Sequence, residues 1–220
     1  MNDYDTVYYS GNKLKFIKWL DNEYIIRRSK NIYHETKTLN VIKDLHIDGT
    51  YIDIGAYIGT HSIVFSKIFN ADRVIAFEPQ KNIYEILLEN LELNNIDNVF
   101  SYNVGLGNHK FNGISYIDEI RKNLENFGAT RIDEDKSGNI PINILDDYNF
   151  KDVHLIKIDV EGYEREVLEG AKLTIDNNDV KCIITECHNK NDYDKQLSLL
   201  KDYGFARLCR RDENIIWLKK

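Results

Sequence analysis

Two stretches of the chain end an apolar run with side chains that can take or hold a proton. The run over 153–158 leads into Asp159 and Glu161, and the run over 180–185 leads, after a glutamate, into His188. If both runs are parallel strands, these groups lie at neighbouring strand ends, where they could share a proton or a metal ion. We expect them to act as bases or to bind a substrate. The alternatives are a helix N-cap for Asp159, a first-turn acid for Glu161 and an exposed loop histidine.

A glycine turn joins another apolar run to a helical pattern. Residues 51–54 lead into Gly55, Gly59 follows, and helical spacing begins at 60–69. Glycine adopts backbone angles that other residues avoid and lets a ligand approach the main chain, while free N–H groups at the helix start face the turn. The G-x-x-x-G spacing is not the G-x-G-x-x-G of dinucleotide folds. It suits a nucleoside ligand without phosphates, such as S-adenosylmethionine, and argues against NAD. A turn that serves packing alone is the alternative.

Polar residues also end two further expected strands. Glu78 follows the run 73–77 and precedes a proline, so its carboxylate could accept both ribose hydroxyls of a nucleoside. Its alternative role is that of an acid at a helix start. Asn103 and Val104, just before Gly105, are expected to line the adenine mainly through backbone groups, or simply to end a strand.

Asp53 and Lys157 belong to the expected strands themselves. Asp53, at the exit of its strand, either contacts the methionine part of the ligand or holds the glycine turn through backbone N–H groups. Lys157 could pair with one of the acids that follow it, as a plain ion pair or as part of the site.

Strands and helices alternate along most of the chain. This alternation predicts an α/β fold with a mostly parallel sheet, right-handed crossovers and helices on both faces, in which the C-terminal hairpin adds one antiparallel strand. Ligands of such sheets bind at the carboxyl ends of the strands, near the topological switch point. The expected strands are 50–54, 73–77, 99–104, 153–158, 180–185, 205–209 and 215–218, and the expected helices are 60–69, 81–94, a short one ending near 168, and 192–202.

The residues before this alternation form an extension. Residues 1–48 are expected to be a helical or cap-like N-terminal extension, and residues 49–220 the ligand-binding domain. Helical spacing covers 35–45, whereas 13–20 fits either a short helix or a strand-like cap.

A lid-like insertion is expected at about 108–140. This segment is polar, contains several glycines and is longer than ordinary connections, which is typical of functional loops and hairpins. Asn126, Thr130 and Arg131 in it could bind the substrate that accepts the transferred group. A hairpin without a functional role is the alternative.

Composition narrows the function. The chain has 220 residues, a net charge of −7 and 42% hydrophobic residues, which suits one α/β domain and argues against a general nucleic-acid binder. Three cysteines without C-x-x-C spacing predict neither a disulfide framework nor a zinc site, and no other ligand spacing requires a metal. Without an apolar run of membrane-spanning length, and with a polar start, we expect a soluble protein of a reducing compartment, the cytoplasm.

Five motifs in order resemble the FkbM-type methyltransferases. The resemblance covers about residues 35–188, and its most specific part is the block that ends the strand before Asp159. The motifs are Asp-Ile-Gly-Ala-x-Ile-Gly-Thr-His (53–61), Ala-Phe-Glu-Pro (76–79), Leu-Asp-Asp (145–147), Ile-Lys-Ile-Asp-Val-Glu-Gly-Tyr-Glu (156–164) and Val-Leu-Glu-Gly-Ala (167–171).

The resemblance implies a class I, Rossmann-like fold with a seven-stranded sheet that uses S-adenosylmethionine, usually to methylate a hydroxyl oxygen. Tyr57 stands where the family usually has Asn, and Tyr163 where it often has His. The cofactor-binding residues expected from the motifs and strand ends are Asp53, Gly55, Tyr57, Gly59, Thr60, His61, Glu78, Asn103, Val104 and Asp159.

Three functions fit these observations. The first is an O-methyltransferase acting on a hydroxyl of a sugar or glycan, with Asp159, Glu161 and His188 as catalytic groups. The second is a methyltransferase for another acceptor, such as an RNA ribose, a lipid or a small molecule, although RNA fits poorly with the acidic charge. The third is a binding module that has lost its catalytic activity, against which the intact glycine turn and strand-end motifs argue.

Overall fold

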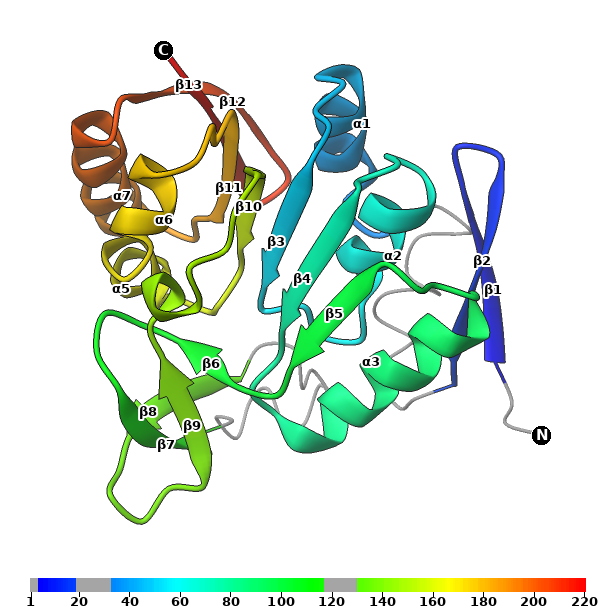
Figure 1. Cartoon of the computed structure of the whole chain (residues 1–220), viewed down its shortest axis with the longest axis horizontal. Coiled ribbons are helices and arrows are strands. Elements are labelled where there is room, and N and C mark those ends of the chain that lie inside the picture. Colours follow the sequence, from blue (N-terminus) through cyan, green and yellow to red (C-terminus); the bar gives the residue numbers. More distant parts are fainter. Residues whose placement is uncertain (1–3, 19–32, 117–129) are drawn as a thin grey trace.

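The computed structural model describes residues 4–18, 33–116 and 130–220. Its centre is a mixed seven-stranded sheet with the order β12-β13-β11-β10-β3-β4-β5, in which β13 alone among these strands runs antiparallel (Figure 1). The expected α/β, Rossmann-like architecture is therefore confirmed. The strands are β3 (Thr50–Ile54), β4 (Arg73–Phe77), β5 (Val99–Tyr102), β10 (Val153–Ile158), β11 (Cys182–Glu186), β12 (Phe205–Arg211) and β13 (Asn214–Lys219).

The order of the strands places the switch point between β3 and β10. From β3 the chain moves outward through β4 and β5, and it then returns to add β10 and β11 on the other side. All five residues of β3 are buried, as expected for a central strand covered on both faces. The carboxyl ends of β3 and β10 thus border the crevice in which such sheets bind ligands.

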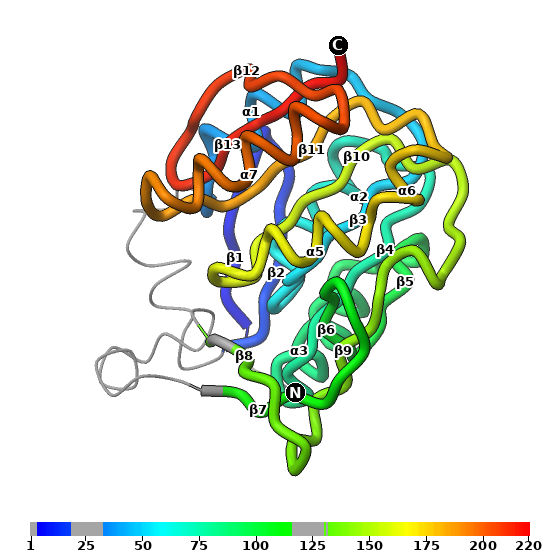
Figure 2. Tube along the Cα trace, turned by 90° about the vertical axis from the view of Figure 1, so that its left-hand side faces the viewer, coloured from blue at the N-terminus to red at the C-terminus, as the bar shows by residue number. Residues whose placement is uncertain are grey.

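Helices cover both faces of the sheet. Figure 2 shows α5 and α7 in front of the sheet and the N-terminal strands behind it, and two hydrophobic clusters fill the spaces between these layers. One cluster includes residues of α1 (Thr36–Asp44), α2 (Thr60–Lys67) and α3 (Lys81–Leu93), and the other includes residues of the 3-10 helix η2 (Leu145–Tyr148), α5 (Glu164–Glu169), α6 (Lys172–Asp176) and α7 (Lys190–Asp202). None of the helices in the described ranges is both long and apolar enough to cross a membrane.

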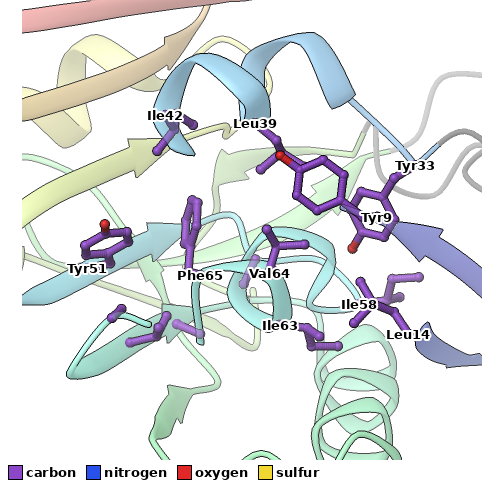
Figure 3. Close-up of a cluster of buried hydrophobic side chains, with 14 of the residues drawn as sticks. Tyr9, Leu14, Tyr33, Leu39, Ile42, Tyr51, Ile58, Ile63, Val64 and Phe65 are labelled. Carbon is purple, nitrogen blue, oxygen red and sulfur yellow. The ribbon is translucent and has the colours of Figure 1, made fainter. Parts of the chain in front are cut away.

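The N-terminal extension shares the core of the sheet domain. Residues 4–17 form the antiparallel hairpin of β1 (Tyr4–Tyr9) and β2 (Asn12–Ile17), so the strand-like alternative is the one adopted. The rings of Tyr9 and Tyr33 lie 5.7 Å apart, next to Leu14 and Ile58 (Figure 3). The hairpin therefore packs directly on the helices that follow the glycine turn.

Two buried asparagines, Asn90 in α3 and Asn94 directly after it, hold this hairpin in place. Asn90 accepts a hydrogen bond from the backbone N–H of Ile17 at 2.7 Å and donates one to the carbonyl of Ile58 at 2.9 Å. Asn94 bonds both the N–H and the carbonyl of Lys15. Since Ile58 lies in the glycine turn, Asn90 connects the N-terminal extension to the turn.

A second, four-stranded sheet with the order β6-β9-β7-β8 follows β5 (Figure 1). Its strands are β6 (Gly105–Leu106), β7 (Phe111–Tyr116), β8 (Arg131–Glu134) and β9 (Ile140–Asn143). The described parts of the expected insertion at 108–140 thus contribute β7, β8 and the first residue of β9 to this sheet, and the role of the insertion as a lid stays a prediction.

We expect Asn90→Ala to lower the free energy of unfolding by about 2–4 kcal/mol. The substitution removes the hydrogen bonds to the part-buried N–H of Ile17 and to the buried carbonyl of Ile58, and each loss costs about 1–3 kcal/mol. Glu92→Ala, an exposed position on the same helix, is the matched control and should change stability by less than about 0.5 kcal/mol. Urea denaturation of both variants tests this, and equal stabilities would contradict the fastening role of Asn90.

Candidate functional site

The glycine turn packs tightly against the end of β10. Gly55 has φ +76°, and a Cβ at this position would lie 1.8 Å from the carbonyl oxygen of Asp159. Its N–H and that of Ala56 both donate to the carbonyl of Phe77 at the end of β4. A glycine is required here because the turn must touch both neighbouring strands.

Asp53 does not reach the cavity, because its side chain points from β3 toward α2. It is fully buried, accepts a hydrogen bond from the Ser62 hydroxyl at 2.6 Å and lies 3.4 Å from Lys157 Nζ. Within the described part of the chain, Asp53 therefore lies behind the glycine turn and contacts the side chains of Ser62 and Lys157, whereas we expected contact with the ligand or with backbone N–H groups of the turn.

Lys157 joins three parts of the site. Its buried ammonium group lies 3.4 Å from Asp53 and 3.2 Å from Asp159, and it donates to the carbonyl of Gly55. Burial alone would lower the pKa of Lys157, but the charges of Asp159 and Asp53 raise it above its ordinary value, so the side chain is a cation. From the sequence, Lys157 was expected to pair with one of the acids that follow it. The structure shows such a pair with Asp159 and a second one with Asp53.

A cavity of about 390 Å³ opens at the carboxyl ends of the central strands, within the size range of small-molecule sites. One side is mainly apolar, with contributions from both sheets, and the other side carries acids and histidines. The apolar side includes Phe77, Val104, Leu106, Phe111, Ile132 and Ile142, and the polar side includes His34, Glu35, His61, Lys157, Asp159, Glu161, Glu186, His188 and Glu213.

Glu78 lies in the wall of this cavity and is 3% exposed. Its two carboxylate oxygens accept hydrogen bonds from the backbone N–H groups of Tyr57 at 3.0 Å and Gln80 at 2.8 Å. A carboxylate has about four acceptor positions, so both oxygens can accept further bonds. Burial raises the pKa of Glu78 to about 7.

Tyr57 lines the cavity in a left-handed conformation, with φ +52°. Asn tolerates this region better than Tyr does, which gives a physical reason for the asparagine usual in the family. Because the Tyr57 N–H still bonds Glu78, the turn keeps its shape with the larger residue.

Two other expected cofactor residues lie outside the cavity lining. The Asn103 side chain donates to the carbonyls of Glu78 and Pro79, so it holds the turn after β4. Gly59, directly before α2, has φ +88°, and a Cβ at this position would lie 2.6 Å from the side chain of Leu87. Val104 does line the cavity, as do Gly55, Tyr57, Thr60, His61, Glu78 and Asp159.

Asp159, Glu161 and His188 all line the polar side of the cavity. His188 Nε2 lies 3.7 Å from Glu161 and 3.0 Å from Glu186. Contact with Glu186 raises the pKa of His188, and the charges of Glu161 and Glu213 add to this effect. Burial raises the pKa of Glu186, and the neighbouring Asp159 contributes.

The N-terminal extension supplies two cavity residues that the sequence did not reveal. Glu35, with φ +50° just before α1, places its carboxylate 3.1 Å from His61 Nε2, and His34 lies beside this pair. Burial opposes ionisation of Glu35, but contact with His61 and the nearby His34 hold its pKa well below the usual range. No motif marks Glu35, since its position depends on packing between distant segments.

The residues expected to bind the acceptor are only partly described. Thr130, next to β8, is buried and lines the cavity. The backbone of Arg131 belongs to β8, whereas Asn126 lies outside the described residues.

The sequence of this chain matches a known protein family over most of its length. The chain matches the model of the methyltransferase FkbM domain over residues 53–207. It belongs to the FkbM methyltransferase family. Methyltransferase 1 of Beauveria bassiana (strain ARSEF 2860) is 26% identical over 199 aligned residues, which cover 76% of this chain and 76% of that protein.

Solved structures agree on the fold of this FkbM methyltransferase. Precorrin-6y C5,15-methyltransferase from Geobacter metallireducens GS-15 has a TM-score of 0.53 at 15% identity and covers 86% of this chain and 89% of its own. Ribosomal protein L11 methylase from Lactobacillus delbrueckii subsp. bulgaricus gives 0.53 at 14%, with 85% and 80% covered. A Streptococcus mutans protein described as a methyltransferase, in complex with SAH, gives 0.52 at 14%, with 83% and 97% covered.

The FkbM methyltransferase uses S-adenosylmethionine as its cofactor, and the cavity fits this molecule. Apolar side chains such as Val104 and Leu106 suit an adenine, and the buried Glu78 carboxylate keeps acceptor positions for ribose hydroxyls. The charged groups of the polar side, among them Glu35 and Asp159, suit the charged end of the cofactor.

We expect Glu78→Ala to weaken the binding of S-adenosylhomocysteine by about 1.5–3 kcal/mol, the range for hydrogen bonds to a charged acceptor. The affinity of the unchanged protein should also fall about tenfold per pH unit below pH 7. Burial favours the protonated acid, whereas ribose hydroxyls donate to the ionised carboxylate, so protonation competes with binding.

Titration calorimetry between about pH 5.5 and 8 measures both effects. In the Glu78→Gln variant, which keeps the size of the side chain, the pH dependence should disappear. If the affinity for S-adenosylhomocysteine does not change with pH, in Glu78→Ala or in Glu78→Gln, then Glu78 only accepts hydrogen bonds from the backbone of its turn and does not bind the cofactor.

A second expectation concerns Lys157→Met. Removing the cation leaves the buried Asp53 uncompensated, so the free energy of unfolding should fall by about 3–5 kcal/mol. The double variant Asp53→Asn, Lys157→Met removes both charges and should recover much of this loss in denaturant unfolding. A double variant no more stable than the single one would contradict the charge explanation.

Proposed function

We propose that this FkbM methyltransferase transfers a methyl group from S-adenosylmethionine to a hydroxyl oxygen of a sugar or glycan. The observation that carries the proposal is the polar side of the cavity, where Asp159, Glu161, Glu186 and His188 lie close together. Carboxylates offer many acceptors for the hydroxyl groups of a sugar, and an imidazole ring offers N–H donors to its oxygens.

The charge of this wall also bears on the alternatives. Five of its residues, Glu35, Asp159, Glu161, Glu186 and Glu213, are acids, and their ionised carboxylates would repel the phosphates of an RNA backbone. A lipid acceptor fits poorly for a different reason. The bound cofactor would cover the apolar side of the cavity with its adenine, which leaves the polar side for the acceptor. An uncharged acceptor rich in hydroxyl groups agrees best with the wall.

The reaction requires alignment of the acceptor and removal of its proton. S-adenosylmethionine supplies an electrophilic methyl group, so the protein has mainly to hold the acceptor oxygen in line. The hydroxyl proton needs a base at the cavity wall, and we assign Asp159, Glu161 and His188 to base and acceptor-binding roles. Lys157, 3.2 Å from Asp159, fixes the position of that carboxylate.

The three cysteines support a further proposal on location. Cys182, Cys187 and Cys209 are free thiols, as is usual for proteins of a reducing compartment such as the cytoplasm.

We expect Asp159→Asn to reduce turnover by about 10²–10⁴-fold, the usual contribution of a general base. Its affinity for S-adenosylhomocysteine should change much less, because the asparagine is isosteric. The assay measures methyl transfer from labelled cofactor to a panel of free sugars, glycosides, nucleotide sugars, RNA and lipids.

Methyl ethers formed on sugars, and lost in Asp159→Asn, are the expected result. Labelled RNA or lipid with unlabelled sugars would instead assign the enzyme to another acceptor class. If Asp159→Asn keeps full turnover, another residue acts as the base.

A further inference from the structure

Three side chains at two neighbouring strand ends form a compact group on the cavity wall. Glu161 lies in the turn after β10, Glu186 is the last residue of β11, and His188 follows it. One carboxylate oxygen of each glutamate and one imidazole nitrogen all lie within 4.8 Å of one another. These distances would let a single ion contact all three side chains.

The buried carboxylate of Glu186 independently indicates a ligand at this place. Its side chain is 9% exposed, and its buried Oε2 atom has no hydrogen-bond partner among the described residues. His188 Nε2 is only 3.0 Å away, but the ring does not direct an N–H bond at this oxygen. A buried carboxylate oxygen without a donor is costly, whereas a cation in the adjoining cavity would satisfy it.

The surrounding charges also favour a cation. Asp159 and Glu213 line the same wall, and Glu213 lies 3.9 Å from His188 Nδ1. The lysine on this side of the cavity, Lys157, lies between Asp53 and Asp159. In the described ranges, Glu186 forms no ion pair with a lysine or an arginine.

We propose that Glu161, Glu186 and His188 bind a divalent metal cation on the β10–β11 side of the cavity. Two carboxylates and one imidazole form a mixed oxygen and nitrogen set, which suits a first-row cation such as Mn²⁺ or Zn²⁺. Three protein ligands leave coordination positions for water or substrate. The sequence indicated that Asp159, Glu161 and His188 could share a metal ion, but it did not reveal Glu186 as a ligand.

The role of the cation rests on the proposed transfer to a sugar hydroxyl, but its binding does not. Neighbouring hydroxyls of a sugar can occupy the open coordination positions, which orients the acceptor. A bound cation also lowers the pKa of a coordinated hydroxyl, so the proton passes more easily to a carboxylate such as Asp159.

Mn²⁺ binding to the full chain tests the site without cofactor or acceptor. After treatment with EDTA and its removal, the loss of the free Mn²⁺ signal in electron paramagnetic resonance should show one saturable site. Glu186→Gln and His188→Gln should each weaken the affinity at least about tenfold, since even outer-shell changes cost 10–100-fold. Glu161→Gln, at a more exposed side chain, should do the same.

Asp194→Asn is the control, because it removes the same charge from an exposed position on α7 that does not line the cavity. Its Mn²⁺ affinity should stay within about threefold of the unchanged protein, and thermal unfolding of every variant verifies the fold. The proposal is wrong if the unchanged protein shows no saturable binding, or if Asp194→Asn loses as much affinity as the ligand variants.

Turnover separates this inference from the proposed function. With a sugar acceptor, EDTA should abolish most of the methyl transfer and Mn²⁺ should restore it. Methyl transfer that continues unchanged in EDTA would overturn the role of the cation while leaving the sugar acceptor in place. Saturable Mn²⁺ binding without methylation of any sugar would overturn the proposed acceptor and retain the metal site.

Discussion

The buried ammonium group of Lys157 is the interaction on which the site depends. It lies between Asp53 of β3 and Asp159 at the end of β10, and it bonds the carbonyl of Gly55. Two strands and the glycine turn are therefore held at one point by charge. A charge removed from water costs several kcal/mol unless it is paired, so these four residues are effective only together.

This arrangement explains why the cavity opens where it does. Gly55 must touch the Asp159 carbonyl, and the turn must also bond Phe77, so the turn bridges the ends of three strands. The second sheet contributes to the apolar side, and Glu35 of the N-terminal extension contributes to the polar side. Segments far apart in the sequence thus complete a site whose centre is a single strand–turn–helix unit.

Local pattern predicted the central sheet well. The bounds of β3, β4 and β10 agree with the predicted strands because continuous apolar runs end sharply at glycine, proline or charged residues. The sequence did not predict α6, η2 or the pairing within the second sheet. Strands as short as β6, with two residues, carry no periodic signal, and their pairing depends on distant partners.

Some site residues were likewise predictable from local pattern, whereas others depend on how strands pair. Glu78 and Asp159 reach the cavity because they follow strands whose carboxyl ends meet there, which topology alone predicts. Asp53 and Lys157 lie inside strands, where side chains alternate between the two faces. Their parallel register pairs them directly, on the face that Tyr51 and Leu155 share. The alternation of side chains would therefore have predicted a buried ion pair for Asp53. For a residue inside a strand, the face of the sheet on which its side chain lies determines whether it contacts the ligand or holds the residues that do.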